Sequence, residues 1–440
     1  GSLRGSMMFE KYDAYKDSGV EWLGQLPENW DLLPNKHIFK LKKNLVGKRS
    51  KEYELLSLTL NGVIKRDMEN PEGKFPAEFD TYQEVKSGDF IFCHFDVEET
   101  PRTVGLSRFD GMITGAYTVY KVNAEKFCPE FLYYFYLNLD TGKRLKPLYK
   151  GLRNTIGKDI FGEFKTFIPN YSEQVKISNF LDQKVTEIDQ AIAIKKQQIA
   201  LLNERKQIVI QKAVTQGLDP NVAMKDSGVE WIGEIPEHWK IKKLKFICKS
   251  QGRIGFKGYS SDDLVEANEG ALTLGATHLN WNGEIILDQP VYLNWKKYYE
   301  SPEIMVKKDD ILIVQRGSTC GKVAIVDKDY GEVTINPSLV LLKEFRENPY
   351  FCVESIKVVL NGILNEVSKT AIPMISQFQI NNIQIALPPL EEQVFIVKKV
   401  QEVTAQYSEI NKFILDEIIR LKEYKTTLIN DAVTGKIKVA

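Results

Sequence analysis

Two segments of the chain carry hydrophobic residues at the spacing of long amphipathic helices. In the first segment the apolar residues recur every three, four or seven positions, which is a heptad seam with some members missing. Its members are Leu181, Val185, Ile188, Ile192, Ile199, Leu202 and Val209. The second seam is weaker because Thr404 and Asn411 interrupt it. Its apolar members are Val400, Tyr407, Ile418, Leu421 and Leu428.

Capping signals bound both segments. The helix-start signals are Ser172 with Glu173 and Pro388 with Pro389, and the helix-end signals are Gly217 and Gly435. We therefore expect helices within residues 171–218 and 389–440, each about 40 residues and roughly 60 Å long. A lone heptad helix cannot bury its seam, so we expect the two to pair as an antiparallel coiled coil. The alternative is two separate helical hairpins, each folded onto its neighbouring domain.

The remaining sequence predicts two β-rich globules. Short apolar runs bounded by turn residues predict strands at residues 88–93, 114–122, 310–314 and 323–326. Short helices are expected at residues 131–139 and 350–360. The layout is therefore α+β: a globule over residues 9–170, a helix over 171–218, a second globule over 219–388 and a helix over 389–440.

The chain is also an internal repeat. Residues 16–30 read KDSGVEWLGQLPENW and residues 225–239 read KDSGVEWIGEIPEHW, with eleven of fifteen positions identical. Glu173-Gln174-Val175 and Ala213-Val214-Thr215 both recur 219 residues later, so the two helical segments align without a gap. The globules between them share only scattered positions. A pseudo-twofold frame with divergent globules is the organisation that we expect.

Composition restricts the class of protein. The 59 Lys and Arg residues balance the 59 Asp and Glu residues, which excludes a nucleic-acid binder driven by overall basic charge. Five scattered cysteines without a CxxC pair predict reduced thiols and a cytoplasmic location, and four scattered histidines give no zinc-site spacing. No apolar run approaches the roughly 20 residues of a membrane span. Residues 1–6 are typical of a vector-derived leader, and we expect the native start at Met7 or Met8, so that residues 1–8 comprise the leader and the start.

Three motifs come close to catalytic or nucleotide-binding loops. Residues 151–158 and 317–322 resemble phosphate-binding loops but have the wrong spacing between their glycines. Residues 348–351, Asn-Pro-Tyr-Phe, lack one proline of the Asn-Pro-Pro-Tyr loop of adenine methyltransferases. We interpret all three as turns, and we expect no catalytic residue and no metal site in this chain.

Local positive charge follows each copy of the repeated motif. Residues 32–51 and 240–261 each contain seven cations and no acid, and residues 141–158 form a third acid-free stretch. Such stretches suit a phosphate backbone, although most charge runs are only solvated surfaces. Base reading requires polar side chains on loops, such as those after the strand at residues 310–314. The candidate DNA-binding residues are Lys42, Lys43, Lys48, Arg49, Arg102, Thr103, Arg108, Arg153, Asn154, Lys243, Arg253, Lys257, His278, Asn280, Gln315, Arg316, Ser318, Thr319 and Lys369.

The repeated motif, the divergent globules and the two helices that begin with Glu-Gln and end in Ala-Val-Thr together resemble one family. It is the specificity (S) subunit of type I restriction–modification systems, and the resemblance covers essentially the whole chain after residue 8. The resemblance implies that each globule is a target-recognition domain that reads one half of a bipartite, asymmetric DNA site. It further implies that the paired helices set the spacer between the half-sites and dock two modification (M) subunits.

The same resemblance implies that the chain is not itself an enzyme. The partner subunits would carry the cofactors: S-adenosylmethionine for adenine methylation by M, and ATP with Mg²⁺ for translocation and cleavage by the restriction (R) subunits. Two alternatives are a fused methyltransferase, which would need the loops that are missing here, and a coiled-coil scaffold without sequence-specific DNA binding. The scaffold predicts no salt-dependent DNA affinity, whereas a DNA reader predicts a steep fall with salt.

Overall fold

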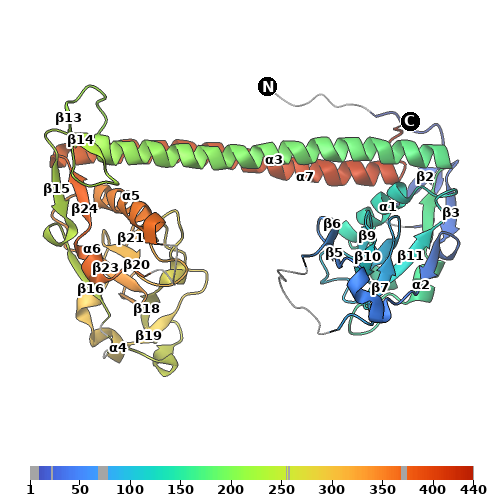
Figure 1. The fold of residues 1–440 in the computed structure, drawn as a ribbon, viewed down its shortest axis with the longest axis horizontal. Helices are drawn as coiled ribbons and strands as arrows, with labels where there is room; N and C mark the ends of the chain where they lie inside the picture. Colours follow the sequence, from blue (N-terminus) through green and yellow to red (C-terminus); the bar gives the residue numbers. More distant parts are fainter. Residues whose placement is uncertain are drawn as a thin grey trace. The chain divides into compact units, whose positions relative to one another are not determined.

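The computed structural model describes residues 9–20, 23–67, 78–253, 255, 258–367 and 374–439. The chain divides into two compact units: unit 1 comprises Gly1–Lys196 with Leu415–Ala440, and unit 2 comprises Gln197–Ile414. Each unit contains one globule of mixed strands and helices together with segments of the two long helices, α3 and α7 (Figure 1).

The globule of unit 1 is built on a four-stranded antiparallel sheet in the order β4–β11–β8–β9. Its central strand β8 is buried along its whole length, as the run of apolar residues predicts. The strands are β4 Phe39–Lys42, β8 Phe90–Phe92, β9 Val104–Leu106 and β11 Thr118–Val122, and the helices are α1 Pro129–Thr141 and α2 Lys158–Glu163. Smaller antiparallel pairs complete the unit: β1 Tyr15–Asp17 with β2 Gln25–Pro27, β3 Asp31–Pro34 with β12 Lys165–Ile168, β5 Leu56–Thr59 with β6 Gly62–Lys65, and β7 Gln83–Val85 with β10 Gly111–Ile113.

The globule of unit 2 repeats this sheet in the order β16–β23–β20–β21, again antiparallel throughout. The strands are β16 Lys249–Gly252, β20 Ile311–Val314, β21 Val323–Ile325 and β23 Leu339–Lys343, and the helices are α4 Trp295–Tyr299, α5 Pro349–Val367 and α6 Gln377–Asn381. The antiparallel pairs β13 Met224–Asp226 with β14 Glu234–Pro236 and β15 Lys240–Lys243 with β24 Gln384–Leu387 correspond to β1–β2 and β3–β12.

The globules differ in their second layer. Unit 2 has a second four-stranded sheet, β17 Leu264–Val265, β19 Tyr292–Asn294, β18 Gly270–Leu274 and β22 Val333–Ile335, in which β18 and β22 are parallel. Within its described residues, unit 1 has the separate pairs β5–β6 and β7–β10 at the corresponding place. The shared sheet is therefore common to two globules whose sequences barely align, and their differences lie in the layer and loops above it.

Most elements predicted from the sequence are confirmed. The predicted strands correspond to β8, β11, β20 and β21, although each observed strand is shorter than its prediction. The two predicted short helices correspond to α1 and α5, and both extend beyond their predicted ends. Both helices begin at a proline, Pro129 or Pro349, a first-turn position that proline tolerates.

The two long helices are α3 Tyr171–Gln216 and α7 Leu390–Val433. Helix α3 ends directly before Gly217, and Gly435 follows α7; both glycines have positive φ values, of 77° and 70°. This is the left-handed conformation that commonly ends helices. The predicted ends of both helices are thus confirmed.

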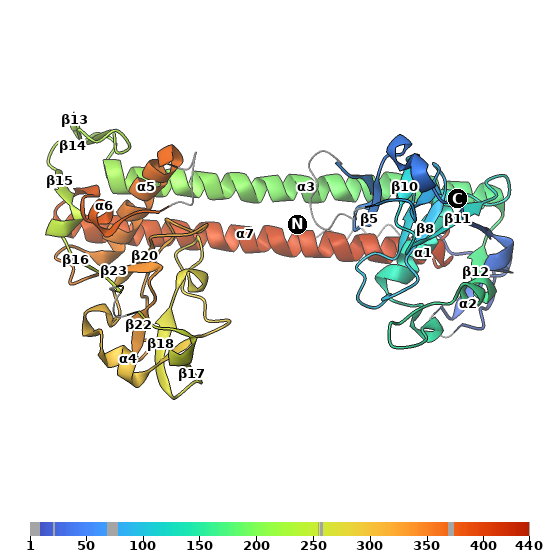
Figure 2. The same cartoon turned by 60° about the horizontal axis from the view of Figure 1, so that its bottom comes forward.

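Segments of α3 and α7 lie beside each other in each unit (Figures 1 and 2). In unit 1, Lys195 pairs with Glu417 at 2.6 Å and Asp189 pairs with Lys425 at 2.7 Å, which gives an antiparallel direction. In unit 2, the Asn411 Nδ2 donates to Asn203 Oδ1 at 2.8 Å. Asn411, which interrupts the apolar seam of the second helix, therefore forms an amide hydrogen bond to the first helix.

The residues predicted to pair the helices are all withdrawn from solvent at least in part. The buried ones are Leu181, Ile188, Ile192, Val400, Ile418 and Leu428, and the half-buried ones are Val185, Ile199, Leu202, Val209, Tyr407 and Leu421. A coiled coil along the whole length of the helices remains a prediction.

The repeated sequence motifs meet in each unit, which gives the repeat a structural reason. In unit 1 the Trp30 indole donates to Glu173 Oε1 at 3.2 Å. In unit 2 the Trp239 indole donates to Glu392 Oε1 at 3.1 Å. Both tryptophans are fully buried. The duplicated residues therefore fix the start of each long helix against its own globule.

The glutamine of each Glu-Gln pair adds a second connection. Gln174 accepts from the Cys128 N–H at 2.9 Å, and Gln393 accepts from the Asn348 N–H at 3.0 Å. These N–H groups lie at the starts of α1 and α5, where helices leave donors unsatisfied. The same amide thus ties a long helix to a globule helix in both units.

Candidate nucleic-acid interface

The globule of unit 1 has a groove at the carboxyl end of the central strand β8. This strand-end groove has a volume of about 650 Å³. Five short segments next to strands or helices line this groove. They are residues 43 and 45 after β4, residues 81 and 83 at β7, residues 94–95 after β8, residues 115–118 before β11 and residues 155–158 before α2. Loops at strand ends are held by a rigid sheet, so this groove is a suitable place for recognition.

The strand-end groove combines cations with neutral hydrogen-bonding groups. Lys43 and Lys158 are exposed, and neither has a carboxylate partner among the described residues. Gln83 is fixed by donating to the Tyr117 carbonyl at 2.6 Å. Thr155 adds a hydroxyl at the rim. Free lysines suit phosphates, and amide and hydroxyl groups suit base edges, so the groove carries both kinds of DNA contact.

The floor of the groove includes a buried histidine. His94 stacks on Phe92 with their ring centres 5.5 Å apart, and the Tyr120 hydroxyl lies 3.3 Å from its Nε2. Burial, with a contribution from the nearby Lys158 charge, lowers the pKa of His94 to about 4. The imidazole is therefore neutral near pH 7 and has a structural role in the floor.

Unit 2 has a corresponding edge at the carboxyl end of its central strand β20. Ile156 N–H donates to the His94 carbonyl at 2.8 Å, and Ile375 N–H donates to the Gln315 carbonyl at 2.8 Å. The loop that begins at Gln315 and Arg316 therefore occupies in unit 2 the place of the loop after β8. The predicted reading residues Arg316 and Ser318 lie there and are exposed, and Thr319 is half-buried.

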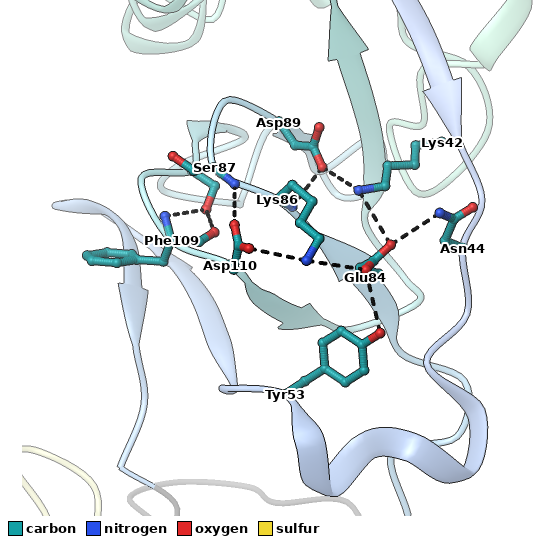
Figure 3. Close-up of polar contacts among 10 residues, drawn as sticks. Lys42, Asn44, Tyr53, Glu84, Lys86, Ser87, Asp89, Phe109 and Asp110 are labelled. Carbon is teal, nitrogen blue, oxygen red and sulfur yellow. Dashed lines mark hydrogen bonds and ion pairs between the residues drawn. The ribbon is translucent and has the colours of Figure 1, made fainter.

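Several candidate DNA-binding residues are instead engaged inside the globules. Lys42 is one: it pairs with Asp89 at 2.7 Å and with Glu84 at 3.8 Å, in a network that also includes Asn44 and Lys86 (Figure 3). The carboxylate of Glu84 has its pKa lowered chiefly by the Asn44 amide, with smaller contributions from the two lysines. Lys42 stabilises the packing of β4 against the loops, and its charge is already balanced.

Four more candidates in unit 1 contact carboxylates: Arg102 and Thr103 do so inside the globule, whereas Arg153 and Asn154 do so at its surface. Arg102 donates to Asp140 at 3.1 Å, and the buried Thr103 hydroxyl donates to the same carboxylate at 2.7 Å. Arg153 forms a bidentate pair with Asp96, at 2.5 and 3.1 Å, and Asn154 lies 3.4 Å from Glu99. These contacts order the loops.

In unit 2, three more candidates make internal contacts. Arg253 is 8% exposed and donates to the Ile335 carbonyl and the Thr334 hydroxyl, both at 3.0 Å, so it holds β22. His278 is buried between the Gly275 N–H and the Gln289 carbonyl. Asn280 donates to Glu284 at 2.6 Å and closes a turn. Their polar groups are satisfied by the protein and have little capacity left for DNA.

The other candidates keep their polar groups at or near the surface. Lys43, Lys48, Arg49 and Arg108 in unit 1 are exposed, and Lys243 in unit 2 is half-buried. The Gln315 amide donates to the Pro337 carbonyl at 2.9 Å. Lys257 and Lys369, as well as part of the first repeated motif at residues 21–22, lie outside the described residues.

The sequence did not single out Thr81, Gln83, Tyr117 and Thr155 as groove residues. They come from three separate loops and have no common spacing. The one available signal was Lys158, which lies in the third acid-free stretch but was not selected as a site residue.

Two negative observations apply to the part of the chain that the structure describes. No three or more His, Cys, Asp or Glu side chains gather there at metal-binding distances. No described helix combines the length and the apolar character that crossing a membrane requires.

Comparisons with known proteins agree with this geometry. Residues 236–420 match the family described as the type I restriction modification DNA specificity domain. The type I restriction enzyme MjaVIII specificity subunit of Methanocaldococcus jannaschii is 29% identical over 335 residues, 73% of this chain and 74% of that protein. The MjaX protein of the same organism, which carries the name of a type I restriction enzyme specificity subunit, is 25% identical and covers 98% of this chain and 99% of that protein.

A solved structure has the same fold over almost the whole chain. It is described as the structural basis of complex assembly and conformational transition of the type I R-M system, and its matching chain has a TM-score of 0.66 at 15% identity. The match covers 94% of this chain and 99% of that one. The chain is therefore similar to the specificity subunits of type I restriction–modification systems, which is the resemblance that its repeated motifs predicted.

Proposed function

We propose that this chain is the DNA sequence-recognition subunit of a type I restriction–modification complex, in which each globule reads one half of a bipartite, asymmetric site. The observation that carries the proposal is the common sheet with divergent strand ends. Two globules share the strand order of their central sheet, but Lys43, Gln83 and Thr155 line the edge in unit 1, whereas the loop at the edge of unit 2 exposes Arg316 and Ser318. Two different half-sites require such a difference on a common support.

We further propose that α3 and α7 set the spacer between the half-sites and dock two modification subunits. Helix α3 has 46 residues, about 69 Å at 1.5 Å per residue, which is about two turns of DNA. Large apolar residues remain exposed on the long helices, as at a protein interface. They include Ile194, Leu415, Ile419 and Tyr424 in unit 1 and Leu201, Ile208, Ile410 and Phe413 in unit 2.

In this proposal the chain performs no chemistry itself. S-adenosylmethionine would be bound by the modification subunits, and ATP with Mg²⁺ by the restriction subunits. What this chain supplies is the position of the target, through contacts to phosphates and base edges.

The test is to map modified bases on plasmid DNA from cells that express this chain with its modification partner. One bipartite motif with modified adenine in both halves is the expected result. If the complex assembles but no new modification appears and DNA affinity does not depend on salt, the chain is a scaffold and the proposal is wrong.

A further inference from the structure

A second cleft in unit 1 lies between the tip of the β5–β6 hairpin, α1 and the long helices. Its volume is about 550 Å³, and Leu60 and Asn61 at the hairpin tip line it. Leu60 is 65% exposed. From the long helices the cleft receives Lys196 and Lys422, which have no carboxylate partner among the described residues.

Unit 2 has a corresponding cleft of about 130 Å³ between a turn, α5 and the long helices. At its tip are Trp281, which is 63% exposed, and Asn282. Lys322 lies over the Trp281 ring, with its Nζ 5.8 Å from the ring centre. Lys206 from α3 lines the opposite wall and has no carboxylate partner within the described residues.

The two clefts are equivalent in sequence position as well as in arrangement. Each tip is an Asn-Gly turn after an exposed apolar residue, Leu60-Asn61-Gly62 in one and Trp281-Asn282-Gly283 in the other. Gly62 and Gly283 have φ values of 90° and 84°, which only glycine adopts readily. Globules with divergent sequences have thus kept the same kind of turn.

Part of the helix wall is the same in the two clefts, while Lys196 and Lys422 line the unit 1 cleft alone. The unit 2 cleft is lined by Lys206, Gln207 and Ile210, and the unit 1 cleft is lined by Lys425, Thr426 and Ile429, each 219 residues later. Each helix therefore presents a lysine at the same position to an exposed apolar tip. A repeated site suggests that both clefts bind the same kind of partner.

The charges favour an anionic partner. In unit 1, Lys425 is balanced by Asp189 and Arg102 by Asp140, so the charges of Lys196 and Lys422 are left over. In unit 2, Lys357 is balanced by Glu354 at 2.7 Å, so those of Lys206 and Lys322 are left over. Surplus lysines beside an apolar tip and an asparagine suit the edge of a DNA groove. There, lysines meet phosphates and apolar side chains insert against sugars and bases.

We infer that both clefts are DNA-backbone contacts, so that the long helices themselves take part in DNA binding beside the strand-end edges of the globules. The inference rests on the proposed function and adds to it. Leu60 and Trp281 contact the groove of the duplex, and the lysines of α3 and α7 contact its phosphates. The helices then contribute to affinity directly.

The test uses the assembled complex of this chain with its modification subunits and a duplex that contains the mapped motif. DNA affinity is measured over a range of salt concentrations for Lys206→Gln and, as a matched control, for Lys212→Gln. Lys212 is an exposed lysine of α3 that does not line the cleft, whereas Lys206 is half-buried. The loss of one phosphate contact lowers the slope of log K against log salt by about one. We expect this for Lys206→Gln and for Lys422→Gln, and no change for Lys212→Gln.

A second pair of variants tests the tip. Trp281→Ala is expected to lower affinity for DNA by about tenfold, whereas Trp295→Ala, a partly exposed tryptophan on α4 of the same unit, leaves it unchanged. Co-purification with the modification subunits and the melting temperature show whether each variant is folded and assembled.

The outcomes separate this inference from the function on which it rests. If the wild type binds its motif with a steep salt dependence and the cleft variants keep the same slope and affinity, the helices do not contact DNA and only this inference fails. If the cleft variants lose the modification subunits with an unchanged slope, the clefts dock protein and the inference is overturned. If the wild type does not bind the motif, both proposals fail.

Discussion

His94 in the floor of the strand-end groove is buried among Phe92, Tyr120 and Phe161, with Lys158 nearby. No carboxylate is among the groups that shift its pKa, and burial disfavours its charged form. Neither the residue type of His94 nor its place in the sequence indicated that its side chain is buried among aromatic rings.

The lowered pKa of His94 predicts a specific loss of stability in acid. In the unfolded chain a histidine titrates near 6.5, and in the folded chain His94 titrates at about 4. Between these values the unfolded state binds the additional proton, so stability falls as pH falls, by about 1.4 kcal/mol per pH unit from this group. The melting temperature of the His94→Gln variant should therefore fall less between pH 7 and pH 5 than that of the wild type. Equal losses would show that His94 does not contribute.

The five cysteines give a second prediction for single residues. All five are free and buried, and burial raises the pKa of each thiol, that of Cys248 to about 12. The reactive species is the thiolate. We therefore expect a disulfide-exchange reagent to label the native protein far more slowly than the protein in denaturant. Rapid labelling of a native thiol would contradict the buried placement.

Individual site residues were the least predictable feature. The acid-free stretch at residues 32–51 predicted that Lys42 and Lys43 are equivalent cations. In the structure Lys43 is exposed in the groove, whereas Lys42 pairs with Asp89, which lies 47 positions away in the sequence. The partner of each lysine depends on which strands and loops of the folded globule lie next to it. A local charge run cannot supply that information.

At the scale of elements, periodicity and capping were sufficient for the long helices. The heptad spacing and the terminal glycines predicted α3 and α7 closely, because those signals are local and repeated over many turns. The order of strands in the sheets was not predictable, because it depends on contacts between distant segments. The parallel pair β18–β22, for example, joins residues 270–274 to residues 333–335.

The packing of α3 can be tested with two adjacent leucines. Leu202 is a half-buried seam residue, whereas Leu201 is 63% exposed. Lysine at residue 202 would bring a charge to the packed face, so we expect Leu202→Lys to destabilise unit 2 by about 1–3 kcal/mol. Leu201→Lys should have little effect. The measurement is thermal unfolding of the isolated chain followed by circular dichroism, and equal melting temperatures for the two variants would contradict the seam.

At the scale of the whole chain, the internal repeat was the most informative signal. The repeated motifs predicted two related units, and the structure gives their reason: Trp30 contacts Glu173 in one unit, and Trp239 contacts Glu392 in the other. The sequence did not predict that the two globules share a sheet, because many different apolar sequences can form a buried strand of the same pattern. The proposed function rests on the combination of a repeated frame and different strand ends.

We propose that each globule reads its own half of the DNA site. The most direct measurement is the modification frequency of motif variants, mapped base by base, for the wild type, for Arg316→Ala and for Arg346→Ala. Arg316 lies at the strand-end edge of unit 2, and Arg346 is an exposed arginine beyond the other end of β23. We expect Arg316→Ala to relax or weaken recognition in one half-site only, by about 1–3 kcal/mol at the contacted base pair. We expect Arg346→Ala to behave as the wild type. Equal loss in both half-sites with Arg316→Ala would contradict the assignment of one globule to one half-site.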